Sequence, residues 1–296
     1  MQSETDKIRK LPCWNGGLEI SILKGGLSNA NYLVQDSNGK HVVRFGVDYP
    51  FHHVSRAREL MVARAAHAAG IAPEVQYATP GVTVTQFLGA KTFTENDVRE
   101  NAPRIGKLLK TFHLALPRHI TGAGFMFWVF HVIRDYAATL RAVTNPYTDE
   151  LPDLLKQAET LEAVQVPMPI IFGHNDLLPG NILDDGKKLW LIDFEYAGFN
   201  TAMFDLAGAS SNAQMSVAQA SELLQSYLAS KPDSSFMRAF AAMQCASLLR
   251  ETMWAMVSCL HLKNADVDYG AYVIENRKRY QAALDTYQSA HGLIMP

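Results

Sequence analysis

The sequence predicts an α+β fold of two lobes, in which a small antiparallel-sheet lobe precedes a larger, mainly helical lobe. Short apolar runs bounded by Gly and Asn turn signals fill the chain up to Leu88. Beyond that residue, apolar side chains recur at helical spacing, apart from one expected strand hairpin. We therefore expect an N-terminal lobe at residues 1–88 and a C-terminal lobe at residues 89–296.

Within the first lobe, strands are expected at residues 18–23, 31–34, 41–45 and 82–88. A helix is expected at residues 55–69, where Gly70 provides its end. The segment between the first two strands, residues 24–30, reads Lys-Gly-Gly-Leu-Ser-Asn-Ala. Such a loop can fold over phosphates and offer backbone N–H groups, although Gly-Gly also makes ordinary hairpins.

Helices are expected to dominate the second lobe. Thr94 and Asp97 form a capping-box pattern, and apolar residues then recur up to Phe112. His113, next on this helix, is assigned to core packing. The aromatic run at residues 125–130 fits core packing or a lobe-covering strand, and an exposed version could line a homodimer interface. A long helix is expected at residues 233–260, then a turn at 266–272 and a last helix at 276–287.

The composition narrows the class of protein. With 48% hydrophobic and 19% charged residues, the chain has the composition of a soluble globular enzyme. Its net charge of -2 gives no indication of nucleic-acid binding, which usually requires an excess of basic residues. The sequence has no membrane-spanning apolar stretch and no signal-peptide pattern, so we expect a cytoplasmic protein without membrane insertion. Cys13, Cys245 and Cys259 are expected to be free thiols.

The most informative segment runs from His174 to Asp193. His174-x-Asp176 is followed by Asn181, and Asp185-Gly186 separates two apolar runs, which predicts a hairpin that brings Asn181 and Asp193 to the same end. A carboxylate such as Asp176 can accept the proton of an attacking hydroxyl, and oxygen ligands such as Asn181 and Asp193 can hold Mg²⁺. A polar loop before an ordinary hairpin is the alternative, but the spacings and the apolar approach to Asp193 coincide.

This order resembles the catalytic loop and metal-binding aspartate of protein kinases. His174-Asn-Asp176, Gly180-Asn-Ile-Leu183 and the run from Ile192 to Asn200 (Ile-Asp-Phe-Glu-Tyr-Ala-Gly-Phe-Asn) are similar to the choline/ethanolamine kinase family, which groups with the aminoglycoside phosphotransferases. The resemblance covers nearly the whole chain. It implies a protein-kinase-like fold that binds ATP and Mg²⁺ between its lobes.

The resemblance also implies which residues bind the nucleotide. Arg44 takes the place of the phosphate-binding lysine of protein kinases, and Glu59 is its expected partner, although Glu59 could instead be an exposed helix carboxylate. The hinge that meets the adenine base is expected at residues 86–88. The nucleotide-binding set is therefore Gly25, Gly26, Ser28, Asn29, Arg44, Glu59, Gln86, Phe87 and Leu88. Asp205 is expected to hold the catalytic loop, and Glu195 to support the metal ligands.

An acceptor site for a cationic alcohol follows from the same resemblance. Aromatic faces and a nearby carboxylate can hold an ammonium group. The matching positions are Trp254, Tyr269 and Tyr272, and Tyr196, which follows Glu195, completes the expected set. Two positions depart from the animal choline kinases: Asn212 stands in place of a pocket glutamate, and Glu251 in place of a second tryptophan. Glu251 and Trp254 share a helix face, so Glu251 could restore the negative charge. Without the resemblance, Trp254 and the tyrosines would be read as packing residues.

We therefore expect an ATP- and Mg²⁺-dependent kinase that phosphorylates the hydroxyl of choline or a similar cationic amino alcohol. Kinases of ethanolamine, thiamine or an aminoglycoside are alternatives of the same class, but aminoglycosides need several carboxylates more than aromatic walls. A catalytically dead nucleotide-binding protein is an alternative of another class. The presence of Asp176, Asn181 and Asp193 together argues against it.

Overall fold

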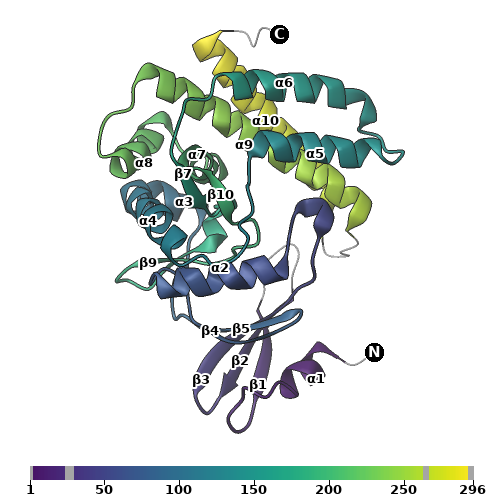
Figure 1. The fold of residues 1–296 in the computed structure, drawn as a ribbon, viewed down its shortest axis with the longest axis vertical. Helices are drawn as coiled ribbons and strands as arrows, with labels where there is room; N and C mark the ends of the chain where they lie inside the picture. Colours follow the sequence, from purple (N-terminus) through teal and green to yellow (C-terminus); the bar gives the residue numbers. More distant parts are fainter. Residues whose placement is uncertain (1–2, 24–29, 263–266, 293–296) are drawn as a thin grey trace.

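The computed structural model describes residues 3–23, 30–262 and 267–292, and its sheet and its long helices lie at opposite ends of the molecule (Figure 1). The sheet is antiparallel with the strand order β1-β2-β3-β5-β4. Its strands are β1 Glu19–Leu23, β2 Ala30–Asp36, β3 Gly39–Phe45, β4 Val75–Thr79 and β5 Val82–Gln86. The four expected strands are confirmed, but the last one ends at Gln86 instead of Leu88.

A small core closes one face of this sheet. Val34, Val43 and Val84 lie on neighbouring strands and are buried together with Ile8. Ile8 belongs to helix α1 Glu4–Arg9, which was not among the expected elements and begins at a Ser3 cap. The helix is too short and too polar to show a clear apolar period, because only one of its residues is buried.

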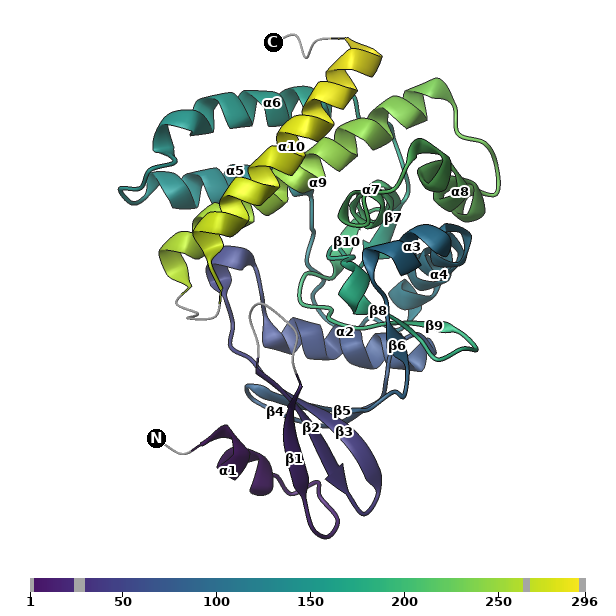
Figure 2. The same ribbon diagram turned by 180° about the vertical axis from the view of Figure 1, so that it is seen from behind.

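Helix α2 Arg56–Ala68 runs between the sheet and the rest of the chain (Figures 1 and 2). This is the expected helix, with Ser55 as its N-cap residue. Gly70 follows it with φ +73°, a left-handed conformation that glycine adopts without strain. A short 3-10 turn, η1 Pro50–His52, precedes α2 and reaches the helical end, where His52 is buried.

The helical end is built largely around two long helices, α9 Ser234–His261 and α10 Tyr269–His291, which lie side by side (Figure 2). The predicted long helix is confirmed, and Asp233 caps it. A turn was expected at 266–272. This prediction is wrong from Tyr269 onward, because Asp268 caps a helix that already begins at Tyr269.

The other helices are α3 Glu95–Glu100, α4 Ala102–Ala115, α5 Val129–Arg141, α6 Leu151–Ala163, α7 Ala202–Asn212 and α8 Val217–Leu228, with 3-10 turns η2 Leu116–Arg118, η3 Thr148–Glu150 and η4 Pro179–Asn181. The capping box of Thr94 and Asp97 is confirmed.

Two small sheets lie between α2 and these helices. One has the order β6-β8-β9, with β6 Lys91–Thr92, β8 Ile182–Asp184 and β9 Leu189–Leu191. It contains the expected hairpin, in which Ile182 pairs with Leu191. The other sheet pairs β7 Ile170–Gly173 with β10 Gly198–Thr201. Residues 174–181 carry Asp176, and we call this segment the catalytic loop after the role expected of that residue. The segment leaves β7 and enters β8, so both sheets fix its ends.

The aromatic run at residues 125–130 packs mainly inside the molecule. Phe127 and Phe130 are buried, as expected, whereas Met126 is 53% exposed. No strand forms at this described segment beyond a single bridge from Met126 to Phe199, because Val129 already begins α5. Among the described helices, none combines the length and apolar character needed to cross a membrane.

Candidate active site

Asp176 lies on a loop that buried hydrogen bonds hold in place. The backbone N–H groups of His174 and Asn175 both donate to the carboxylate of Asp205, each at 2.7 Å. His113 Nε2 lies 2.8 Å from the same carboxylate. The expected loop-holding role of Asp205 is therefore confirmed, and His113 is a packed residue, as expected, that supports Asp205. Burial by itself would raise the pKa of Asp205, but the hydrogen bond from His113 holds that pKa below its usual value.

His174 acts as an internal brace. Its side chain is buried, and burial lowers its pKa, so the ring is neutral. Nε2 lies 2.9 Å from the carbonyl oxygen of Ile192 and donates to it, which ties the catalytic loop to the residue before Asp193.

Asn181 and Asp193 lie together at the open end of the hairpin, because the N–H of Ile192 donates to the carbonyl of Asn181 at 3.1 Å. Asn181 Nδ2 donates to the backbone carbonyl of Asp176 at 2.9 Å. This bond orients the amide, so that Oδ1 is its remaining ligand atom. An amide oxygen and a carboxylate are suitable donors for Mg²⁺. The residues present therefore fit the ion.

Arg44 belongs to a cluster of two arginines and three carboxylates. Its Nη1 lies 2.8 Å from Glu59 Oε1 and 2.7 Å from Asp193 Oδ1, and its Nη2 lies 3.1 Å from Glu195 Oε2. The pairing of Arg44 with Glu59 is as expected. Arg56 was missed: its Nη1 lies 2.6 Å from Glu59 Oε2 and 2.9 Å from Glu195 Oε2. Arg56 stands three residues before Glu59, and this helical spacing could have indicated that the two side chains pair. The cluster carries one net negative charge, which suits an entering cation.

The other expected nucleotide-binding residues are less fully described. Gly25, Gly26, Ser28 and Asn29 lie outside the described residues. The backbone N–H of Gln86 donates to the carbonyl oxygen of Glu74 at 2.9 Å, and the backbone N–H of Phe87 donates to the carbonyl oxygen of Lys40 at 3.1 Å. These two N–H groups are therefore engaged within the sheet, and Leu88 follows them just beyond the end of β5.

The structure brings together the five residues expected to bind the acceptor, which we call the acceptor wall: Tyr196, Glu251, Trp254, Tyr269 and Tyr272. Trp254 Nε1 donates to the Tyr196 hydroxyl at 2.8 Å. The rings of Tyr269 and Tyr272 lie edge-on to Trp254, at centroid distances of 6.1 and 6.0 Å. The Tyr272 hydroxyl donates to Glu251 Oε1 at 2.7 Å.

One face of Trp254 is covered by His52. The two rings are stacked at 4.9 Å between centroids, and Trp254 is only 7% exposed. His52 also lies 2.9 Å from the Ser258 hydroxyl. These contacts support the packing interpretation of Trp254, and its role in acceptor binding stays a prediction.

Arg250 is a second residue that the sequence analysis missed. Its Nη1 lies 2.8 Å from Glu251 Oε2 and 4.0 Å from Asp176 Oδ1, and its guanidinium carbon lies 4.4 Å from the centre of the Tyr196 ring. It therefore joins the acceptor wall to the catalytic loop. Burial raises the pKa of Asp176, and the charge of Arg250 opposes this shift. Arg250 shares a helix face with Trp254, four residues later, which was the available signal.

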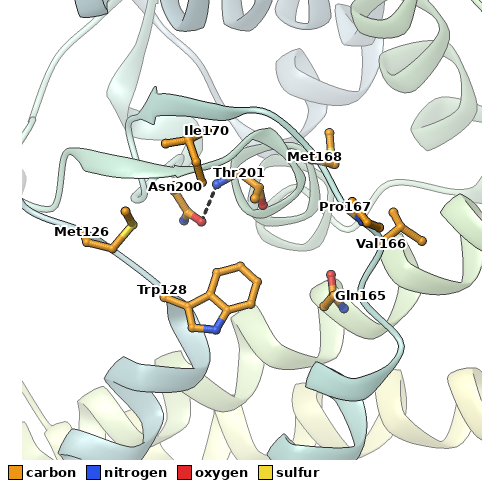
Figure 3. A pocket seen from close by; sticks show the side chains of 9 residues that line it. All are labelled: Met126, Trp128, Gln165, Val166, Pro167, Met168, Ile170, Asn200 and Thr201. Carbon is orange, nitrogen blue, oxygen red and sulfur yellow. Dashed lines mark hydrogen bonds between the residues drawn. The ribbon is translucent and has the colours of Figure 1, made fainter.

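A separate cavity of about 570 Å³ lies at the start of β7, at the opposite end of that strand from the catalytic loop (Figure 3). Met126, Trp128, Met168 and Ile170 give it an apolar lining, and the hydrogen bond from Thr201 N to Asn200 Oδ1 lies at its edge. Among the described residues that were predicted to bind nucleotide, metal or acceptor, none lines it.

The fold places this molecule among the protein-kinase-like proteins, as the comparison with solved structures shows. A choline/ethanolamine kinase family protein from Mesorhizobium loti has a TM-score of 0.76 and 28% identity, with 96% of this chain and 95% of that chain covered. The model of the phosphotransferase enzyme family matches residues 19–240. The chain therefore belongs to that family.

Curated relatives agree over the same region. A probable ethanolamine kinase from Arabidopsis thaliana is 29% identical over 213 residues, which cover 63% of this chain and 54% of that protein. Protein LicA of Haemophilus influenzae is 28% identical over 211 residues, which cover 69% of this chain and 61% of that protein. The chain thus spans somewhat more than half the length of these relatives.

Proposed function

We propose that this chain transfers the γ-phosphoryl group of ATP, with Mg²⁺, to the hydroxyl of choline or a similar cationic amino alcohol. The observation that carries the proposal is the contact between catalytic loop and acceptor wall. Arg250 Nη1 lies 4.0 Å from Asp176 Oδ1 and 2.8 Å from Glu251 Oε2, so Asp176 lies close to the acceptor wall. A small molecule whose hydroxyl is placed beside Asp176 would therefore lie against the wall. The nucleotide lies between the lobes proposed at residues 1–88 and 89–296.

Each residue of the catalytic loop then has a role. Asp176 orients the acceptor hydroxyl and takes its proton on a carboxylate oxygen. Asn181 and Asp193 would hold Mg²⁺, which neutralises charge on the phosphates when bound. Arg44, positioned by Glu59, binds phosphate oxygens with two donors of its guanidinium.

Recognition of an ammonium group fits the aromatic wall and its carboxylate. The names of the relatives, an ethanolamine kinase and a choline/ethanolamine kinase family protein, support this acceptor class. Ethanolamine and thiamine remain alternatives within it. An aminoglycoside is disfavoured, because its several ammonium groups need more carboxylates than Glu251 supplies.

The test is an ATP-consumption screen across choline, ethanolamine, thiamine and an aminoglycoside, with and without Mg²⁺. We expect Mg²⁺-dependent turnover that requires a small ammonium-bearing alcohol. Turnover equal to the acceptor-free background with every compound would contradict the proposal and favour a catalytically dead protein.

Asp176→Asn is the matching variant, because it keeps the shape and removes the proton acceptor. We expect kcat to fall by about 10²–10⁴-fold, as is usual for loss of a general base, while the KM for ATP changes little. Near-normal kcat in this variant would remove Asp176 from the mechanism.

A further inference from the structure

Arg250 is buried, yet only part of its guanidinium is used. The residue is 4% exposed, and Nη1 is paired with Glu251. Nε and Nη2 have no hydrogen-bond partner among the described residues. Buried charged donors are normally hydrogen-bonded. Nε and Nη2 therefore require acceptor oxygen atoms that the described residues do not supply.

The two unpaired donors lie on one edge of the guanidinium. Nε–H and the neighbouring Nη2–H point the same way, and this edge is one at which a carboxylate or phosphate accepts two parallel hydrogen bonds. A neutral hydroxyl can satisfy only part of it. The unused edge therefore has the chemistry of an oxyanion site.

The groups around Arg250 are mostly aromatic. Its guanidinium carbon lies 4.4 Å from the centre of the Tyr196 ring and 5.8 Å from that of Phe127. Tyr136, fully buried, directs its hydroxyl to His52 Nδ1 at 3.3 Å. Among the described residues, the carboxylates paired with Arg250 are Glu251 and Asp176, and both lie on the Nη1 side. The oxyanion would therefore come from a bound molecule.

We infer that the Nε–Nη2 edge of Arg250 binds a carboxylate of the acceptor, so that the preferred acceptor carries a hydroxyl, an ammonium and a carboxylate group. This inference rests on the proposed function and narrows its acceptor class. Choline and ethanolamine lack such a group. The charges agree: Arg250 and Glu251 form a neutral pair, so a zwitterion can lie against the wall without leaving an unbalanced charge.

The experiment compares alcohols that differ only by the carboxylate: L-serine with ethanolamine, L-homoserine with 3-amino-1-propanol, and L-carnitine with β-methylcholine. We measure kcat/KM for all six with the full chain and Mg·ATP. In at least one pair the carboxylated member should be preferred by about 10–100-fold, the value of one or two hydrogen bonds to a charged group. This comparison needs no variant.

Arg250→Met should bring the ratio within that pair close to one. Arg250→Lys, which keeps the charge but loses the two-donor edge, should give an intermediate ratio. Arg99→Met is the control, because Arg99 is a partly buried arginine bonded to the carbonyl of Ala213, away from the site, and its ratio should equal that of the wild type. Thermal melting identifies a variant that fails to fold, in which case the wild-type ratios decide.

Three outcomes would overturn the inference. If the wild type prefers the decarboxylated member of every pair, the proposed function stands and the carboxylate site does not exist. If Arg250→Met slows both members of a pair equally, Arg250 acts on the transferred phosphoryl group or on folding. If no compound supports turnover above background, the proposed function itself fails, and the inference fails with it.

Discussion

Asn175 and Asp193 both hold left-handed backbone conformations, with φ of 62° and 67°, which residues other than glycine rarely adopt. Such a conformation costs about 1–3 kcal/mol and persists only where surrounding contacts enforce it. Asn175 Nδ2 donates to the carbonyl of Tyr196 at 3.1 Å, and its Oδ1 accepts from Asn200 at 2.9 Å. The strain is thus located at the two loop segments that carry Asp176 and the expected metal ligand.

The role of Trp254 can be tested at the same scale. Trp254→Leu keeps apolar bulk but removes the ring, and cation–π contacts contribute about 0.5–2 kcal/mol. We expect the KM for an ammonium-bearing acceptor to rise several-fold to about thirtyfold, with an unchanged KM for ATP. Because His52 stacks on the ring, the melting temperature should fall as well. A lower melting temperature with an unchanged acceptor KM would mean that Trp254 only packs.

The sequence was most informative for residues in local patterns. Asp176, Asn181 and Asp193 follow from spacing along one hairpin, and the structure brings them together. Arg56 and Arg250 were not predicted, because a charged residue on a helix is normally solvated and its burial depends on distant segments. The partners of Arg250 come from the catalytic loop, its own helix and the segment after β9, which no local pattern relates.

Among the helices, α4 and α8 pack closely at Gly106. Gly106 on α4 lies against Leu223 and Ser226 on α8, and a Cβ at Gly106 would come within 2.5 Å of the Leu223 carbonyl oxygen. The two helices can approach this closely only because position 106 has no side chain. Since α4 also carries His113, this packing helps to position Asp205.

Gly106→Ala should therefore destabilise the protein. The Leu223 carbonyl belongs to backbone and cannot rotate away, so the helices must separate, at a cost of about 1–3 kcal/mol in unfolding free energy. Chemical denaturation measures the change. Gly17→Ala is the control, because no described residue lies within 4 Å of its added Cβ. Equal stability of the two variants would contradict the packing argument.

The elements with strong local signals were predicted well. The hairpin at residues 182–191 and the helix at 233–260 are confirmed, because turn chemistry and capping specify them locally. Helix α10 was expected to begin later than it does. Gly270 weakens the helical signal in its first turn, and only the Asp268 cap and packing against α9 extend it.

At the scale of the whole molecule, the turn at Pro50–His52 connects the two ends of the protein. His52 comes from the part of the chain that builds the sheet, but it packs against Trp254, Ser258 and Tyr136 of the helical end. Burial lowers its pKa to about 2, chiefly by desolvation, so the ring stays neutral in the folded protein.

This burial should make stability depend on pH. Below its ordinary pKa of about 6.5, the imidazole binds a proton in the unfolded chain but not in the folded one. Its contribution is therefore fully present above pH 6.5 and is lost as pH falls toward 2, by up to about 1.4 kcal/mol per pH unit. In His52→Gln, unfolding free energy measured from pH 7 to 4.5 should fall less steeply than in the wild type. Identical slopes would show that His52 is not buried neutral.

The position of His52 bears on how binding of the proposed nucleotide could affect binding of the proposed acceptor. Helix α2 begins four residues after His52 and carries Glu59, which holds Arg44. A displacement of α2 that accompanies nucleotide binding would also move the ring that covers Trp254. Acceptor and nucleotide are then energetically coupled, and by linkage each changes the affinity for the other by the same factor.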